Sequence, residues 1–412
     1  MSEQPPAPSQ ELSTVTCPTC GDTVPTGVYC GACGHHLSLH HDDAKSGFRS
    51  HSYAAAPGEH VLRLSVVTSL FPHLPHRSRT PFRIAVAVVV IALVVLAALR
   101  LQAPMIAVAC LGVPLLVQLY LQESDVYEDL PVPLLGLSVL LGAALGVGFA
   151  LLTRGSVRDS IAASVLGAGT TEHLWLDGVL YPIISGALLV VPAIVCYFVK
   201  PPHVDESLDG FLIGSIGAVG YTAADTITRL APQLKSGVIA HDRGVGSIVV
   251  EALLQGVAVP VTGACLGGVV GAALWVRRRS QVHFGRWLAT ARLMIPVTLL
   301  IYLALGLIDY YQPPQTTLLV LHLVVAVIAL LALRYGLHAV LIHEEHEVSI
   351  GPPRVCPHCE QVVPSMPFCP HCGFAARAAS RTARTRLHLG SDDTAPEPGG
   401  GSSSPVPEGG AS

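Results

Sequence analysis

Residues 316–342 read TTLLVLHLVVAVIALLALRYGLHAVLI, and this stretch decides the class of fold. It exceeds the roughly 20 apolar residues that a helix needs to cross the hydrocarbon core of a bilayer. Polar side chains interrupt it at only a few places, among them His322 and Arg334. The stretch therefore predicts a transmembrane helix.

The composition of the whole chain agrees with a membrane protein. Of 412 residues, 51% are hydrophobic and only 13% are charged, whereas a soluble globular protein carries about 25% charged residues. The net charge of −4 gives no reason to expect a nucleic acid as partner. The first 80 residues lack an early apolar core, so we expect no signal peptide. The lipid bilayer is thus the predicted partner.

Apolar runs predict eight transmembrane helices within a membrane domain at 81–343. The run at 208–228 is the weakest, because it contains Asp209 and Asp225. A stretch at 156–170 has the character of a short re-entrant or interfacial helix, so counts of seven or nine stay open. We expect an all-α polytopic membrane protein with about eight transmembrane helices and two small four-cysteine zinc ribbons. The predicted spans are 82–100, 103–121, 131–152, 178–199, 208–228, 247–276, 287–308 and 316–342.

Lysine and arginine in the short loops predict the orientation, since cytoplasmic loops carry an excess of both. The arginine triplet 277–279 directly follows a span and weighs most. With an even number of helices, both termini of this multi-pass protein lie on the cytoplasmic side of the cell membrane. The cytoplasmic loops then contain Arg77, Arg79, Arg83, Lys200, Arg277, Arg278, Arg279 and Arg286, and the opposite loops contain Arg100, Arg154, Arg158, Arg229, Lys235 and Arg243.

Two cysteine motifs of identical spacing flank the membrane domain. Residues 17–34 read CPTCGDTVPTGVYCGACG, and residues 356–373 read CPHCEQVVPSMPFCPHCG. Each C-x2-C pair directs two thiolates at one ion, and four thiolates complete a tetrahedral zinc site that has no position for water. Such sites are structural, and a segment this short depends on its metal to fold. We predict zinc ribbons at 15–36 and 352–375, with the ligands Cys17, Cys20, Cys30, Cys33, Cys356, Cys359, Cys369 and Cys372.

The remaining cysteines and two histidines have simpler roles. Cys110, Cys196 and Cys265 lie inside apolar runs, where a free cysteine behaves as a small hydrophobic residue. His358 and His371 lie inside C-x2-C pairs, and we expect them to be exposed, because four thiolates already fill each site. The two motifs resemble zinc-ribbon modules of bacterial membrane and regulatory proteins. The resemblance implies a binding role, toward a protein partner or toward each other.

The segments outside these units are polar. Residues 37–80 form a histidine-rich linker that we expect to be solvated. Residues 1–14 and 376–412 are predicted to be disordered tails; the last of these is rich in glycine, serine and proline and cannot bury a core.

Residues 205–228, DESLDGFLIGSIGAVGYTAADTIT, resemble a signature of the PrsW-type intramembrane metalloproteases. The resemblance covers about 80 residues around 182–271. It implies a protease fold, but the positions of the family's metal ligands and catalytic residues differ here. The matching positions are Asp209, Gly210, Gly214, Gly220 and Tyr221; the differing ones are Asp225 and Thr226 for the family's Glu and Asn, Ser185 and Gly186 for its Glu pair, Leu189 for its Lys and Gln255 for its His. The resemblance therefore implies a degenerate relative, and we predict no catalytic residues.

Polar residues within spans are the remaining functional candidates, because charge is costly in lipid. The alternative for each is a purely structural role in an interhelical pair, such as Glu251 with Arg292. Gly263, Gly267 and Gly271 form a small-xxx-small ridge that predicts close helix packing. Three hypotheses follow: a non-enzymatic scaffold or sensor, a PrsW-type protease with altered ligands, and a small-molecule transporter. The polar candidates are Asp225, Glu251, Gln255, Arg292, His322 and Arg334.

Overall fold

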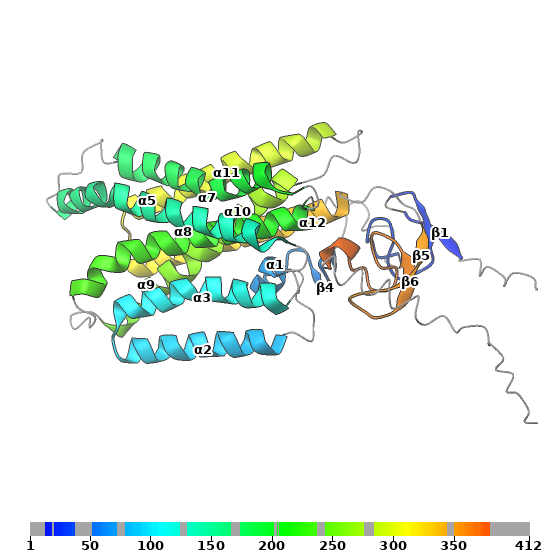
Figure 1. The fold of residues 1–412 in the computed structure, drawn as a ribbon, viewed down its shortest axis with the longest axis horizontal. Coiled ribbons are helices and arrows are strands. Elements are labelled where there is room, and N and C mark those ends of the chain that lie inside the picture. Colours follow the sequence, from blue (N-terminus) through cyan, green and yellow to red (C-terminus); the bar gives the residue numbers. More distant parts are fainter. Residues whose placement is uncertain are drawn as a thin grey trace, which may run out of the picture.

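A bundle of long helices carries two small β modules at one of its ends in the computed structural model (Figure 1). The predictions for the tails at 1–12 and 380–412, and for the linker at 38–51 and 72–78, lie outside the described residues. The structure describes residues 13–18, 20–37, 52–71, 79–123, 130–165, 174–201, 204, 206–236, 244–275, 284–343 and 350–379.

Each predicted span coincides with a helical segment, although helix bounds differ by several residues. Residues 156–165 continue a long helix, so the predicted separate helix at 156–170 is wrong over that part. The helices of the bundle are α2 (Arg79–Ala98), α3 (Gln102–Glu123), α5 (Val132–Val165), η3 (Leu174–Leu180) continued by α7 (Tyr181–Val199), α8 (Ser207–Ser236), α9 (Val245–Leu253) joined through η4 (Leu254–Ala258) to α10 (Val259–Trp275), α11 (Phe284–Tyr310) and α12 (Gln315–His343).

Among the residues that the structure describes, five helical stretches are long and apolar enough to cross a membrane, by length and composition. The apolar parts of α2 and α3 are shorter, at Arg83–Ala98 and Gln102–Val117. The chain thus has the helices of a membrane protein, while the count of eight spans stays a prediction. The five stretches are Val132–Gly155, Leu174–Val199, Val245–Trp275, Leu293–Tyr310 and Gln315–Leu341.

Helix α8, the weakest predicted span, packs between α5 and α10 through glycines. A Cβ atom on Gly214 would collide with the carbonyl of Gly267 on α10. On the other side of α8, a Cβ atom on Gly142 of α5 would collide with the carbonyl of Gly217. The predicted ridge on α10 is thereby confirmed as a contact surface. Because α8 is buried by its neighbours, it needs fewer apolar side chains than a lipid-facing helix.

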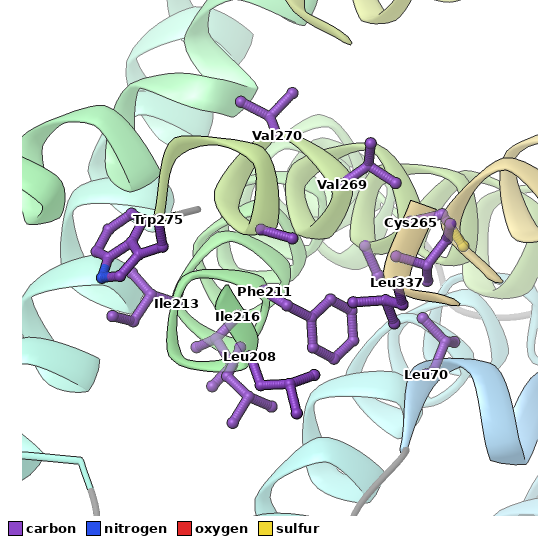
Figure 2. Packing of buried hydrophobic residues seen from close by; sticks show 14 of the residues in the cluster. Leu70, Leu208, Phe211, Ile213, Ile216, Cys265, Val269, Val270, Trp275 and Leu337 are labelled. Atoms are coloured by element: carbon purple, nitrogen blue, oxygen red, sulfur yellow. The ribbon is translucent and has the colours of Figure 1, made fainter. Parts of the chain in front are cut away.

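An apolar core joins these helices to a part of the linker. Phe211 of α8 is fully buried, and Figure 2 shows it in one patch with Leu337 of α12 and Leu70. Leu70 belongs to α1 (Val66–Leu70), which follows the hairpin of β3 (Ser52–Tyr53) and β4 (Ala56–His60). Residues 52–71 are therefore only partly solvated, in contrast to the predicted solvated linker. We call these residues the docking segment.

Two further predictions concern burial. Cys110, Cys196 and Cys265 are all fully buried, which confirms their role as packing residues. The predicted disordered tail is wrong at its first residues: Ala376–Ala378 form the short helix η5, and Ala378 is buried in the same cluster as Tyr53.

Substituting one core glycine tests the packing of α8. Gly214→Ala places a methyl group against the α10 backbone, and overpacking of this kind costs about 1–3 kcal/mol. Gly148→Ala is the matched control, because a Cβ atom there meets no atom within 4 Å and alanine stabilises a helix relative to glycine by about 0.5–1 kcal/mol. Thermal unfolding in detergent should show a lower midpoint for Gly214→Ala only. Equal midpoints for the two variants would contradict the close approach of α8 and α10.

Candidate metal centres

Each ribbon consists of a short hairpin and two cysteine knuckles. The hairpins are β1 (Thr14–Thr16) with β2 (Thr23–Pro25), and β5 (Gly351–Val355) with β6 (Val362–Ser365). In the first knuckle the amide of Gly21 donates to the carbonyl of Cys17 at 2.9 Å. The equivalent bond recurs in the other three knuckles. The donor residue has a positive φ in all four: Gly21 (80°), Gly34 (71°), Glu360 (59°) and Gly373 (73°).

The four sulfur atoms of each ribbon gather at one point. In the first ribbon, Sγ of Cys17 lies 3.8 Å from Sγ of Cys33, and Sγ of Cys20 lies 3.8 Å from Sγ of Cys30. The corresponding distances in the second ribbon are 3.8 and 3.9 Å. A zinc ion about 2.3 Å from four tetrahedral sulfurs sets the sulfurs about 3.8 Å apart. The predicted ligand sets are thus assembled, with a geometry that fits zinc.

The thiols of each cluster influence one another's protonation. Burial raises the pKa of the Cys20 thiol to about 12, while a hydrogen bond from Cys33 lowers the pKa of Cys30 to about 5. Hydrogen bonds from Cys369 and Cys372 likewise hold the pKa of Cys356 below its usual value. A metal must displace the protons of the other thiols, so metal binding strengthens as pH rises. His358 and His371 are exposed, as predicted, and the clusters contain sulfur ligands alone.

The two ribbons pack against each other about a local two-fold axis. Residues of the second ribbon lie 339 positions after their counterparts in the first, as for Cys17 and Cys356. The amide of Tyr29 donates to the carbonyl of Pro370 at 2.9 Å, and the amide of Phe368 donates to the carbonyl of Gly31 at 2.9 Å. These two bonds are equivalent, because Phe368 corresponds to Tyr29 and Pro370 to Gly31. The interface is therefore self-complementary, like that of a symmetric dimer.

Side chains complete the ribbon interface in the same symmetric manner. The ring of Phe368 lies against Gly34, and the ring of Tyr29 lies against Gly373. Because both glycines have positive φ and leave no room for a Cβ atom, they are required for the knuckle and for the interface at once. Met366 packs on Gly31 and shares a buried cluster with Cys17 and Cys30. The two ribbons thus lie against each other, in agreement with one of the two predicted alternatives, while a binding role stays a prediction.

The second ribbon also contacts the docking segment. The amide of Ala375 donates to the carbonyl of Ala54 at 2.9 Å, and Phe374 shares a buried cluster with Tyr53. The amide of Ala54 in turn donates to Nδ1 of His338 on α12 at 3.1 Å. A single residue of the docking segment thus joins the ribbon to the membrane domain.

Arg334 of α12 is fully buried beneath the docking segment. Its guanidinium donates to the carboxylate of Glu59 at 2.8 Å and lies 4.1 Å from the ring centre of Tyr53. Further hydrogen bonds go to the carbonyls of Val61 (2.7 Å) and His60 (3.1 Å) and to the hydroxyls of Thr68 (2.9 Å) and Ser69 (3.2 Å). The docking segment therefore supplies both the countercharge and the acceptors of this arginine.

The other polar candidates form separate contacts. Asp225 pairs with Arg229 at 2.9 Å within α8, and Glu251 accepts from the side chain of Gln102 at 2.7 Å. His322 lies 3.4 Å from Asp309 of α11. Gln255 belongs to η4, and the side chain of Arg292 lies outside the described residues. Glu59 was not identified as a functional residue from the sequence, because an acidic residue in a polar segment is ordinary. The one available indication was Arg334, since an arginine on an apolar helix requires a partner.

Within the described part of the chain, groups of at least three close potential ligands for a metal ion occur at the two four-cysteine clusters. Residues that carry the resemblance to PrsW-type proteases lie along α8. There Tyr221 shares a hydrogen bond of 2.9 Å with Ser185, and Arg229 holds Asp225. The relation to that family stays a prediction.

Substitution at the Arg334–Glu59 pair tests the docking. Arg334→Met removes the donor of the hydrogen bonds to Glu59, His60, Val61, Thr68 and Ser69, so it should free residues 52–71 for limited proteolysis in detergent. Glu59→Gln keeps the shape and should have a smaller effect. Arg229→Met, at the half-buried pair with Asp225 on α8, is the control and should leave the segment protected. Equal protection of Arg334→Met and the control would contradict the docking.

The same pair predicts how docking responds to pH. Burial opposes ionisation of Glu59, but the Thr68 hydroxyl and the Arg334 guanidinium outweigh it and hold the pKa of this carboxyl below its usual 4.5. A group with a lowered pKa stabilises the folded state above its usual pKa, and this contribution is lost as pH falls through the folded value. Protection of residues 52–71 should thus decline in acid, and Glu59→Gln should remove part of that decline.

Comparison of the chain with protein-family models, with curated proteins and with solved structures finds no match in any of the three. The functional argument therefore rests on the geometry of the metal centres and of the docking segment. The two sulfur clusters, the docking segment and the buried Arg334 form one connected unit.

Proposed function

We propose that this chain is a non-enzymatic multi-pass membrane protein whose paired zinc ribbons form a cytoplasmic scaffold or sensor head. The observation that carries the proposal is the pairing of the ribbons and their attachment to α12 through Ala54. Two modules from opposite ends of the chain thus form one unit on the membrane domain. If the ribbons served only to bind a separate protein, they would not need contacts with each other and with α12.

Zinc is the proposed metal, and its role is structural. Four thiolates with sulfur–sulfur distances that suit a tetrahedral zinc ion would fill its coordination shell, leaving no position for substrate or water. The ribbons have little apolar core of their own, so the ions supply most of their folding energy. The head is therefore assembled only when both ions are bound.

The loop charges, and the end of the bundle at which the head lies, support the proposed cytoplasmic placement. Figure 1 places both ribbons at the end where α12 terminates. Lys200, at the end of α7, lies over the rings of Tyr197 and Trp275. A lysine among aromatic residues at helix ends is typical of a membrane interface. Eight passes with both termini at this end complete the proposed topology.

Zinc counting separates this proposal from the protease alternative. Purified full-length protein should contain two zinc ions, one of which is lost in Cys17→Ser/Cys20→Ser and the other in Cys356→Ser/Cys359→Ser. Substitution of all eight ligands by serine should leave none. Elemental analysis of protein in detergent, with Cys265→Ser as the control, measures this directly. A third ion that survives all eight substitutions would contradict the proposal and favour a PrsW-type metal site with altered ligands.

A further inference from the structure

The contacts of the second ribbon continue without interruption from a metal ligand to the buried arginine. Cys369 donates through its amide to the carbonyl of Phe374 at 3.0 Å, and the amide of Gly373 donates to the carbonyl of Cys369 at 2.8 Å. The fold of this knuckle therefore fixes Phe374 and Ala375. Ala375 then holds Ala54, the neighbour of the tyrosine on which Arg334 stacks.

The docking segment is held from two sides. On one side the β3–β4 hairpin meets Phe374 and Ala375 of the second ribbon. On the other side it meets His338 and Arg334 of α12. A two-stranded hairpin is marginally stable by itself, so the segment depends on both neighbours for its fold.

The first ribbon supports the second through the symmetric interface. Phe368, whose amide bonds to Gly31, belongs to the same buried cluster as Tyr53 and Phe374. Loss of metal from either ribbon therefore removes a contact on which the docking segment rests. The second ribbon touches the segment directly, so its metal has the larger influence.

From this chain of contacts we propose that zinc in the ribbon pair holds the docking segment on Arg334, and that loss of zinc releases it. The inference rests on the proposed function, because it takes the metal to be zinc and the ribbons to be structural. It adds a regulatory consequence: zinc availability at the head determines whether the guanidinium of α12 is covered by residues 52–71. Docking of residues 52–71 on the membrane domain then depends on zinc in the head.

Linkage makes the coupling reciprocal. If zinc favours the docked segment, docking must favour zinc by the same factor. Arg334→Met, which removes the main anchor on α12, should therefore weaken zinc binding although Arg334 touches no ligand. Coupling between sites is commonly about 5–150-fold, and we expect about 10-fold for the ion of the second ribbon.

Hydrogen–deuterium exchange tests the release on full-length protein in detergent micelles. Peptides from residues 52–71 should exchange slowly in the zinc-loaded protein and rapidly after chelation. Peptides from the interior of α10 (259–275) are the control and should not change. Zinc is counted in the same samples, so a protein that never contained two ions would overturn the proposed function itself. A protein that contains two ions, but whose residues 52–71 exchange at the same rate after the ions are removed, would overturn only the proposed zinc-dependent docking.

A chelator competition provides the second readout and does not depend on that exchange. Arg334→Met should lose one of its two ions at about one tenth of the chelator concentration that wild type requires. Glu59→Gln, which keeps the guanidinium buried, should shift in the same direction by less. Arg229→Met serves as the control and should match wild type. Identical zinc retention by Arg334→Met and wild type, with residues 52–71 released in the variant, would overturn the coupling.

Discussion

The guanidinium of Arg334 lies on a helix that is long and apolar enough to cross a membrane. A charge in such a place is costly unless it is paired and fully hydrogen-bonded. Here the acceptors come from residues 59–69, more than 260 positions earlier in the chain. The need to satisfy one side chain therefore explains why a polar segment between a ribbon and the first helix is folded at all. The same segment gives the second ribbon its place on the bundle.

A second constraint acts inside the bundle. Helix α8 has glycines on both of its packed faces, where backbones of α5 and α10 approach too closely for any side chain. Close approach replaces the apolar side chains that a lipid-facing helix needs. The low hydropathy of this span and its central position thus have a single cause. In the ribbons, Gly34 and Gly373 combine a positive φ with a neighbouring aromatic ring, so one residue type again meets two requirements.

Patterns local in sequence predicted their structures well. The cysteine spacing predicted both four-cysteine groups that the structure brings together, because a knuckle is a local turn, and apolar runs located the helices, although not all of their ends. Contacts between segments distant in the sequence could not be predicted from such patterns. Nothing in the sequence around Glu59 indicates that it reaches Arg334, and the packing of one ribbon on the other was only one of two predicted alternatives. The first residues of the predicted tail were assigned wrongly because Ala378 and Ala379 follow no apolar pattern in the sequence, yet they are buried in the same cluster as Tyr53.

Pairing of the ribbons within one chain is the central claim, since the position of the docking segment and its dependence on zinc both rest on it. A photoreactive phenylalanine analogue in place of Tyr29 tests it most directly, because this ring lies against Gly373. Irradiation of the zinc-loaded protein, followed by mass spectrometry, should yield a cross-link from residue 29 to the segment 366–374. In a mixture of isotopically light and heavy protein, both halves of the cross-link should carry the same label. Cross-links of mixed label, or none to the second ribbon, would contradict the account.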